Sequence, residues 1–158
     1  MNQNISQLLQ QAIQLEMNVG NLYLLFHRLL PKDAEFWWKL AIEERNHAAL
    51  LKTARQMMNS RVDIPEDLFP PGISNLRDSN QMIIKATEDF EKAPDRVRAF
   101  ELALEIEISA GESHYNNFML TSPDSRITKI FKKLNGDDVS HAERIQQYMI
   151  EHQIPGLN

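Results

Sequence analysis

The stretch from Trp37 to Met58, WWKLAIEERNHAALLKTARQMM, decides the fold. Its apolar residues recur at steps of three and four, which is the spacing of one face of an α-helix. That face reads Trp37, Leu40, Glu44, His47, Leu51, Ala54, Met58. An acid and an imidazole therefore interrupt an apolar stripe, where an unpartnered buried charge costs several kcal/mol. We predict that both side chains are buried and belong to a binding site.

Three further segments show the same helical spacing with ionisable residues on the inward face. Glu16 interrupts the apolar stripe of residues 5–30, and Glu107 interrupts a stripe that begins at Phe100. A third stripe, beginning at Phe131, carries an acid and a histidine three residues apart, as the first stretch does. The inward ionisable residues are Glu16, Glu44, His47, Glu107, Asp138 and His141.

The chain is expected to be almost entirely helical, because it combines this periodicity with only five glycines and no strand-like alternation. Two helical hairpins should turn at Pro31-Lys32-Asp33 and at Ser122-Pro123-Asp124, where turn and N-cap residues gather. Between the hairpins, the prolines of residues 60–77 predict an irregular crossover. The expected helices are 5–30, 33–59, 95–121 and 123–153, with a short additional helix over 78–92.

These elements predict an all-α fold in a single domain over residues 1–158, a four-helix bundle of two antiparallel hairpins with one long crossover. Helical rise puts Glu16 about 22 Å and Glu44 about 20 Å from the first turn, so the two acids come level on neighbouring helices. The same calculation brings Glu107 and Asp138 level in the second hairpin. All six inward residues are therefore expected near mid-height of the bundle.

The two halves of the chain also resemble each other in sequence. A pattern of Ala, two hydrophobic residues, Glu and Gly ends at Gly20 in the first half and at Gly111 in the second. The pattern Lys-Leu-x-x-acid-acid-x-x-His-Ala ends at Ala48 and again at Ala142. The same order in both halves indicates an internal duplication with pseudo-twofold symmetry, which supplies the inward residues as two equivalent sets.

Four buried carboxylates need compensating positive charge, and two divalent cations would supply it with both histidines as neutral ligands. Oxygen and imidazole donors without sulfur suit transition metals, iron first, with manganese or zinc as alternatives. We therefore predict two transition-metal ions as cofactors, bound by the six inward residues. A single buried Glu or His is more often a hydrogen-bonded structural residue, so the prediction depends on the complete set.

The overall composition argues against several classes of function. A net charge of -5 and the lack of any Lys/Arg cluster argue against binding to nucleic acid or to an anionic membrane. No apolar run approaches a membrane span, and the polar N-terminal residues lack a signal-peptide pattern, so we expect a soluble, cytoplasmic protein. Without cysteine, disulfides, iron–sulfur clusters and thiol nucleophiles are excluded.

One glutamate from each of two helices, plus acid-x-x-His from each of the other two, resembles the ferritin-like di-iron carboxylate proteins, and specifically their rubrerythrin branch. AIQLEMNVGNLY around Glu16 and IEERNHAALL around Glu44 are similar to the ligand segments of that branch. The resemblance spans nearly the whole chain. It implies that Glu16 and His47 bind one ion. Glu107 and His141 would bind the other ion, and Glu44 would bridge the two.

Three differences from the rubrerythrin pattern bear on function. Ala110 stands where that branch commonly has a further glutamate. Asp138 is one methylene shorter than the usual glutamate, so it would bind one ion without bridging unless Asn135-Gly136 moves the backbone inward. The alternative for that dipeptide is that the fourth helix restarts at Asp137. Without cysteine there is no rubredoxin-like domain, so electrons would come from a separate donor protein.

Several neighbouring residues are not expected to be ligands. Glu43 and Asp137 directly precede the ligand acids, but a helix turns each of them about 100° away from the inward face, so we expect them to be solvated. Tyr23 and Tyr115 are candidates for hydrogen bonds toward the site. Core or second-sphere positions are expected for the remaining histidines, His27, His114 and His152.

The sequence thus predicts a di-iron oxidoreductase that uses hydrogen peroxide or dioxygen as its small-molecule oxidant. The acids expected to carry the chemistry are Glu16, Glu44, Glu107 and Asp138. One alternative is an iron-handling or storage protein with a ferroxidase site, and another is a metal-free bundle that serves as an interaction module. A homodimer is expected, with Phe36-Trp37-Trp38 divided between the core and an exposed dimer surface.

Overall fold

The computed structural model describes residues 3–58, 72–113 and 126–156, and these ranges are all-helical without a strand. The all-α prediction is confirmed to this extent. Within the described helices, the side chains of Ala110 and Asp138 are among those that lie outside the description. The elements are α1 (Gln3–Leu29), a 3-10 turn η1 (Pro31–Asp33), α2 (Ala34–Met58), α3 (Gly72–Lys92), α4 (Arg96–Ser113) and α6 (Arg126–Glu151).

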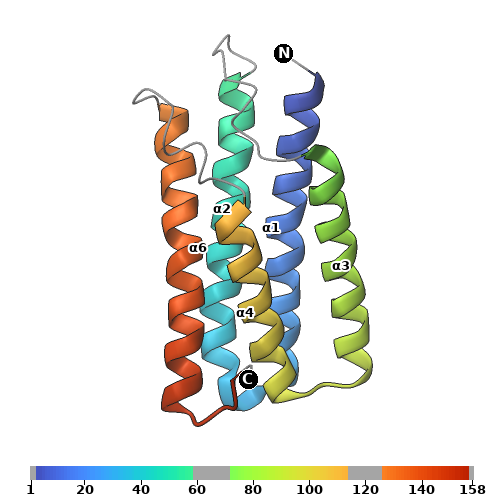
Figure 1. Ribbon diagram of the computed structural model, residues 1–158, viewed down its shortest axis with the longest axis vertical. Helices are drawn as coiled ribbons and strands as arrows, with labels where there is room; N and C mark the ends of the chain where they lie inside the picture. Colours follow the sequence, from blue (N-terminus) through green and yellow to red (C-terminus); the bar gives the residue numbers. More distant parts are fainter. Residues whose placement is uncertain (1–2, 59–71, 114–125, 157–158) are drawn as a thin grey trace.

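The helices lie side by side along one long axis (Figure 1). α1 and α2 form an antiparallel hairpin through η1, at the turn expected from Pro31-Lys32-Asp33, and they share the most extensive helix–helix contact. α4 pairs with α6, while α3 lies on α1. α2 and α6 meet along a narrower seam. The second predicted turn, at 122–124, lies outside the described residues.

The crossover differs from the expectation, because residues 72–77 belong to a helix. α3 begins at Gly72, directly after the last of the prolines, and its buried positions recur at helical spacing in Leu76, Asn80, Ile83 and Phe90. In Figure 1, α3 runs from the end of the bundle where α2 finishes to the end where α4 begins. A helix, and not an irregular linker, therefore makes most of the return along the bundle.

The fourth helix of the sequence prediction does not restart at Asp137. α6 is a single helix that passes without a break through Asn135-Gly136. Glycine within a helix costs about 0.5–1 kcal/mol relative to alanine, which the helix on both sides can offset. The alternative of a restart at this dipeptide is therefore wrong.

The core is centred on aromatic residues of α1, α2 and α4. The ring of the fully buried Trp37 lies 4.9 Å from Phe26 and 4.5 Å from Phe100, measured between centroids. Trp38, the next residue, is 47% exposed. The Phe36-Trp37-Trp38 segment is therefore divided between core and surface as predicted. In the described ranges, no helix has both the length and the apolar content needed to cross a membrane.

One end of the bundle is held by a buried carboxylate. Asp33 in η1 is 2% exposed and accepts two 2.8 Å hydrogen bonds from the guanidinium of Arg96, at the start of α4. The Tyr148 hydroxyl of α6 donates a further 3.1 Å hydrogen bond to the same carboxylate. Burial raises the pKa of Asp33, but the bonds from Arg96 and Tyr148 outweigh it and lower the pKa overall. Asp33 thereby joins both helical pairs.

A buried amide network fixes α3 against α1. The Asn18 side chain donates a 2.8 Å hydrogen bond to Asn80 Oδ1. Asn80 Nδ2 in turn donates to the backbone carbonyls of Gln11 and Leu76, at 3.0 and 2.9 Å. Buried polar groups are costly unless they are paired, so this network favours a single register between the two helices.

Candidate metal centre

The structure brings five of the six inward residues together in the interior of the bundle. Glu44, His47, Glu107 and His141 are buried, and the side chain of Glu16 is 12% exposed. These residues come from α1, α2, α4 and α6, so four of the five described α-helices meet at the site. The sixth residue, Asp138, belongs to α6, but its side chain lies outside the described residues.

Glu16, Glu44 and His47 form the first group. The Nδ1 atom of His47 lies 3.5 Å from Glu16 Oε2 and 3.5 Å from Glu44 Oε2. One potential ligand atom from each residue lies within 4.8 Å of the other two. Donor atoms about 2 Å from one ion are separated by about 4 Å or less, so the group is of the size that one metal ion requires.

Glu44, Glu107 and His141 form the second group, in which one potential ligand atom from each residue again lies within 4.8 Å of the other two. His141 Nδ1 lies 2.8 Å from Glu44 Oε1 and 3.6 Å from Glu107 Oε2. The two oxygens of Glu44 thus face different histidines, since Oε2 faces His47. Glu44 is shared by both groups, in the position that a bridging carboxylate would occupy.

The two imidazole rings lie face to face, with centroids 5.3 Å apart and planes inclined by 18°. Their Nδ1 atoms face the inner carboxylates, whereas each Nε2 atom faces a carboxylate of the opposite helix. His141 Nε2 lies 2.7 Å from Glu43 Oε2, and His47 Nε2 lies 3.4 Å from Asp137 Oδ2. An outer carboxylate of this kind fixes the orientation of the ring and directs the inner nitrogen toward a metal.

The expectation that Glu43 and Asp137 are simply solvated is therefore wrong. Both are only about one-third exposed, at 38% and 34%, because the turn of about 100° from the inward face directs them across the seam between α2 and α6. Arg144 supports Glu43 with hydrogen bonds of 2.6 and 3.2 Å, and Lys133 pairs with Asp137. The repeated acid before each ligand acid was the sequence signal for this role.

Tyr23 and Gly20 of α1 also shape the site. The Tyr23 hydroxyl donates a 2.6 Å hydrogen bond to Glu107 Oε1, which confirms the predicted contact for this tyrosine. A side chain at Gly20 would meet the Ala41 carbonyl and the Cβ of Glu44 at 3.3 Å. Glycine therefore allows α1 to approach α2 closely beside the shared carboxylate.

The inner carboxylates strongly affect the protonation of both histidines. Burial lowers the pKa of His47, but Glu16 and Glu44 outweigh it and raise that pKa to about 11. Burial likewise opposes the effect of Glu107 and Glu44 on His141, whose pKa also rises to about 11. Without metal, the neighbouring carboxylates therefore favour the protonated form of both histidines at neutral pH.

The pKa values of two buried acids, Glu44 and Glu107, shift in opposite directions. Burial raises the pKa of Glu44, but contacts with His141 and His47 outweigh burial and lower it. Burial and the charge of Glu44 together raise the pKa of Glu107. Metal ions would replace the histidine protons as the positive charges of the centre.

The donor set fits two transition-metal ions. Glu44 Oε1 and His141 Nδ1 are both buried and lie 2.8 Å apart. When the histidine loses its proton to an incoming metal ion, each of these two atoms can offer a lone pair to the cation. Carboxylate oxygen and imidazole nitrogen without sulfur favour iron, manganese or zinc.

The remaining candidate residues take no part in this cluster. His27 Nδ1 lies 2.8 Å from the Ala34 carbonyl, and His152 stacks on Tyr148 with ring centroids 4.0 Å apart. Both have the structural surroundings expected from the sequence. His114 and Tyr115 lie outside the described residues.

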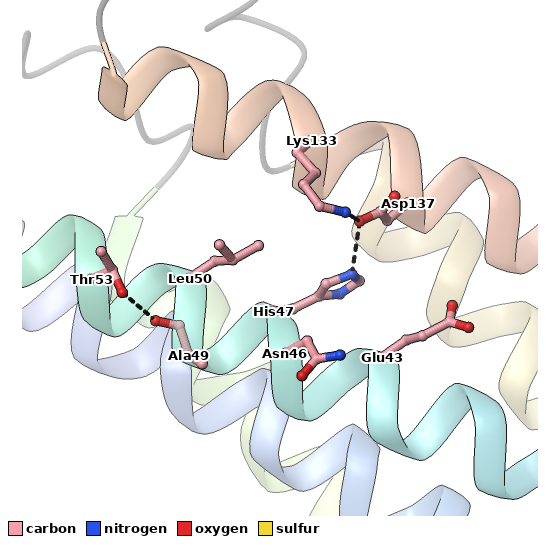
Figure 2. A pocket seen from close by; sticks show the side chains of 8 residues that line it. All are labelled: Glu43, Asn46, His47, Ala49, Leu50, Thr53, Lys133 and Asp137. Atoms are coloured by element: carbon pink, nitrogen blue, oxygen red, sulfur yellow. Dashed lines mark hydrogen bonds and ion pairs between the residues drawn. The ribbon is translucent and has the colours of Figure 1, made fainter.

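A solvent-open cavity of about 510 Å³ adjoins the site between α2 and α6. Figure 2 shows His47 projecting from α2 toward Asp137 and Lys133 of α6. Leu50 and Thr53 of α2 line the cavity further along the helix. The two groups of potential ligands are therefore buried, but one of their histidines borders a cavity.

Comparison with known proteins gives no match to a protein-family model. It also gives no significant match to a curated protein or to a solved structure. The geometry of the site is therefore the basis for inferring the function.

Proposed function

We propose that the protein is a ferritin-like di-iron oxidoreductase of rubrerythrin type that uses hydrogen peroxide or dioxygen as its oxidant. The observation that carries this proposal is the pair of three-residue groups sharing Glu44. Two adjacent groups that share a carboxylate are the minimum that a two-metal centre requires. Metal ions would supply the positive charge that these buried carboxylates otherwise take from protonated histidines.

The arrangement of the helices supports the proposal. The two ligand-bearing pairs, α1 with α2 and α4 with α6, are joined through a segment that returns along the bundle, and α2 and α4 run in the same direction (Figure 1). Ferritin-like bundles also contain one long crossover connection, and their ligands project inward from all four helices. The four helices here supply their acids and histidines in that way.

Two bound redox-active ions would supply one electron each to the oxidant, and a separate donor protein would restore them. The chain itself would orient the ligands through the outer contacts of Glu43 and Asp137. Tyr23 would hold a proton at Glu107 Oε1, close to where oxygen chemistry would occur. Ala110 contributes no carboxylate at the position of the additional rubrerythrin glutamate, so both oxidants remain within the proposal.

A second candidate is an iron-handling protein whose site oxidises Fe(II) and passes it on. The observation that favours it is the cavity at His47, because exchange of ions requires a path from solvent to the ligands. A resident catalytic centre has less need of such a path. The two candidates share the site and differ in whether the metal stays.

Elemental analysis of protein prepared without oxygen, followed by stopped-flow oxidation with peroxide and dioxygen in parallel, tests both candidates. We expect about two transition-metal ions per chain and rapid oxidation by at least one of the oxidants. The matched controls are Glu44→Gln at the shared ligand and Glu35→Gln, an exposed glutamate of the same helix that pairs with Lys39.

The possible outcomes distinguish the oxidoreductase, the iron-handling protein and the metal-free interaction module. Ions that are oxidised, kept and reduced again by an added donor support the oxidoreductase. Iron that accumulates beyond two ions per chain, or that leaves after oxidation, selects the iron-handling protein. A chain that takes up no iron, manganese or zinc refutes both candidates and selects the metal-free interaction module.

A further inference from the structure

The cavity between α2 and α6 reaches only one of the two histidines. His47 lines it together with Glu43, Asn46 and Asp137 (Figure 2), whereas His141 does not. The cavity follows the narrow seam between α2 and α6, where the helices make fewer contacts than within either pair. It is open to solvent, and the imidazole of His47 is part of its lining.

His47 therefore lies between the cavity and the other two members of the first group, Glu16 and Glu44. Its Nε2 atom faces Asp137 on the cavity side at 3.4 Å, while its Nδ1 atom faces Glu16 and Glu44 on the inner side at 3.5 Å. The side chain is 3% exposed and lines the cavity, so the ring lies between the cavity and the inner carboxylates.

The outer contact of the opposite histidine is shorter. His141 is fully buried, and its Nε2 atom lies 2.7 Å from Glu43, compared with 3.4 Å between His47 and Asp137. Glu43 is itself fixed by two hydrogen bonds from Arg144. The two halves of the site are thus unequal in access and in the tightness of the outer contact.

The cavity wall carries two carboxylates, those of Glu43 and Asp137, and each is partly exposed. Arg144 pairs with Glu43 and Lys133 pairs with Asp137, so the carboxylate oxygens are available to a small cation in exchange for these partners. An organic substrate in the cavity would be separated from the inner ligands by the His47 ring, so the geometry does not suit direct reaction there.

We infer that this cavity is the access route for divalent cations, and that His47 admits them first to the group formed with Glu16 and Glu44. This inference rests on the proposed two-metal function. The hydrated ion meets Glu43 and Asp137 at the cavity wall, loses water in exchange for carboxylate oxygens, and passes His47 to the inner ligands. The second ion then reaches His141 through the shared Glu44.

The test is the rate of Co(II) binding to metal-free protein, followed by stopped-flow visible absorbance. Ala49→Phe and Asn46→Trp fill the cavity without altering any proposed ligand. Each should slow Co(II) binding by at least about tenfold, which corresponds to about 1.4 kcal/mol in activation free energy. The number of ions bound at equilibrium and the final spectrum should match those of the wild type.

The matched control is Ala86→Phe, which places the same bulk in a separate cavity of about 380 Å³ lined by α3 and α4. It should load Co(II) at the wild-type rate. The inference is overturned if both cavity variants load as fast as the wild type, or if the control is slowed equally. A wild-type protein that takes up no Co(II), Fe(II) or Mn(II) instead overturns the proposed function, so the two failures are distinguishable.

Discussion

At the scale of single residues, Glu44 should affect metal binding more than the other acids, because it belongs to both groups of potential ligands. Its two oxygens face two histidines on different helices, whereas Glu16 and Glu107 each belong to one group. Loss of a terminal ligand should weaken one ion. Loss of the shared ligand should weaken both.

We therefore expect Glu44→Gln to reduce the bound metal to well below one ion per chain. Glu16→Gln should retain about one ion, because the group of Glu44, Glu107 and His141 stays complete. Anaerobic titration with Mn(II) or Fe(II), measured by elemental analysis after gel filtration, gives the stoichiometry. Equal losses from both variants would contradict the role of Glu44 as the shared ligand.

The two histidines also predict how pH affects the metal-free protein. Their pKa values of about 11 exceed the ordinary value of about 6.5 in the unfolded chain. The stability that they contribute is complete below pH 6.5 and is lost as pH rises toward 11. Unfolding in urea should therefore show lower stability at pH 9 than at pH 6.5, by at most about 1.4 kcal/mol per pH unit for each histidine.

Bound metal should reverse this dependence, because the ions compete with the histidine protons and bind more tightly as pH rises. The variant His47→Gln, which cannot take up the proton, should show a weaker pH dependence without metal. Equal stability of the metal-free wild type at pH 6.5 and 9 would show that the histidines are not protonated by their carboxylate neighbours.

Much of the site could be predicted from sequence at this scale, and the limit has a physical cause. Residues such as Glu16 and His141 interrupt an apolar stripe, and helical periodicity alone directs them inward. Glu43 and Asp137 lie on the flank of the helix, where the neighbouring helix decides whether a side chain meets solvent or a partner. Periodicity describes one helix and contains no information on that neighbour.

At the scale of elements, Asp33 connects the first hairpin with the second through Arg96 and Tyr148. We expect Asp33→Asn to lower the unfolding free energy by about 1–3 kcal/mol, since it removes the charge that Arg96 and Tyr148 contact. Arg96 is 35% exposed, so water can partly compensate it and the loss should stay in this range. Urea unfolding at pH 7 measures the effect.

Glu91→Gln is the matched control, because it removes an ion pair with Arg28 in which both side chains are more than 60% exposed. That change should cost less than about 1 kcal/mol. If both variants lose equally little, the Asp33 contacts do not hold this end of the bundle.

The elements themselves follow from periodicity and turn residues, with α3 as the informative exception. The sequence prediction extended the influence of Pro65, Pro70 and Pro71 as far as residue 77, whereas a proline restricts mainly its own position and the residue before it. Leu76 and Asn80 already carry the inward stripe of the helix. The buried contact of α3 with α1 through Asn18 is a tertiary interaction that no local pattern indicates.

At the scale of the whole molecule, four of the five described α-helices, α1, α2, α4 and α6, converge on the proposed centre, so metal binding should stabilise the bundle that they form. Ions that bind only the folded state add about 2.7 kcal/mol at a hundredfold excess over the dissociation constant. For a chain of this size we expect the thermal midpoint to rise by about 5–10 °C. Circular dichroism melts with and without Mn(II) or Zn(II) measure the shift, and a midpoint that does not move would contradict the two-metal proposal.

The crossed contacts between α2 and α6 carry a consequence for the ancestry of the molecule. Glu43 of the first half orients His141 of the second, and Asp137 of the second half faces His47 of the first. In a protein made of one such hairpin, the histidine would have no acid to orient it. Only a symmetric pair of identical chains would supply that acid, from the second copy. Fusion of two such copies would free each half to mutate separately. The longer side chain of Glu43, at 2.7 Å from its histidine, and the shorter one of Asp137, at 3.4 Å, are the kind of divergence that such independence allows.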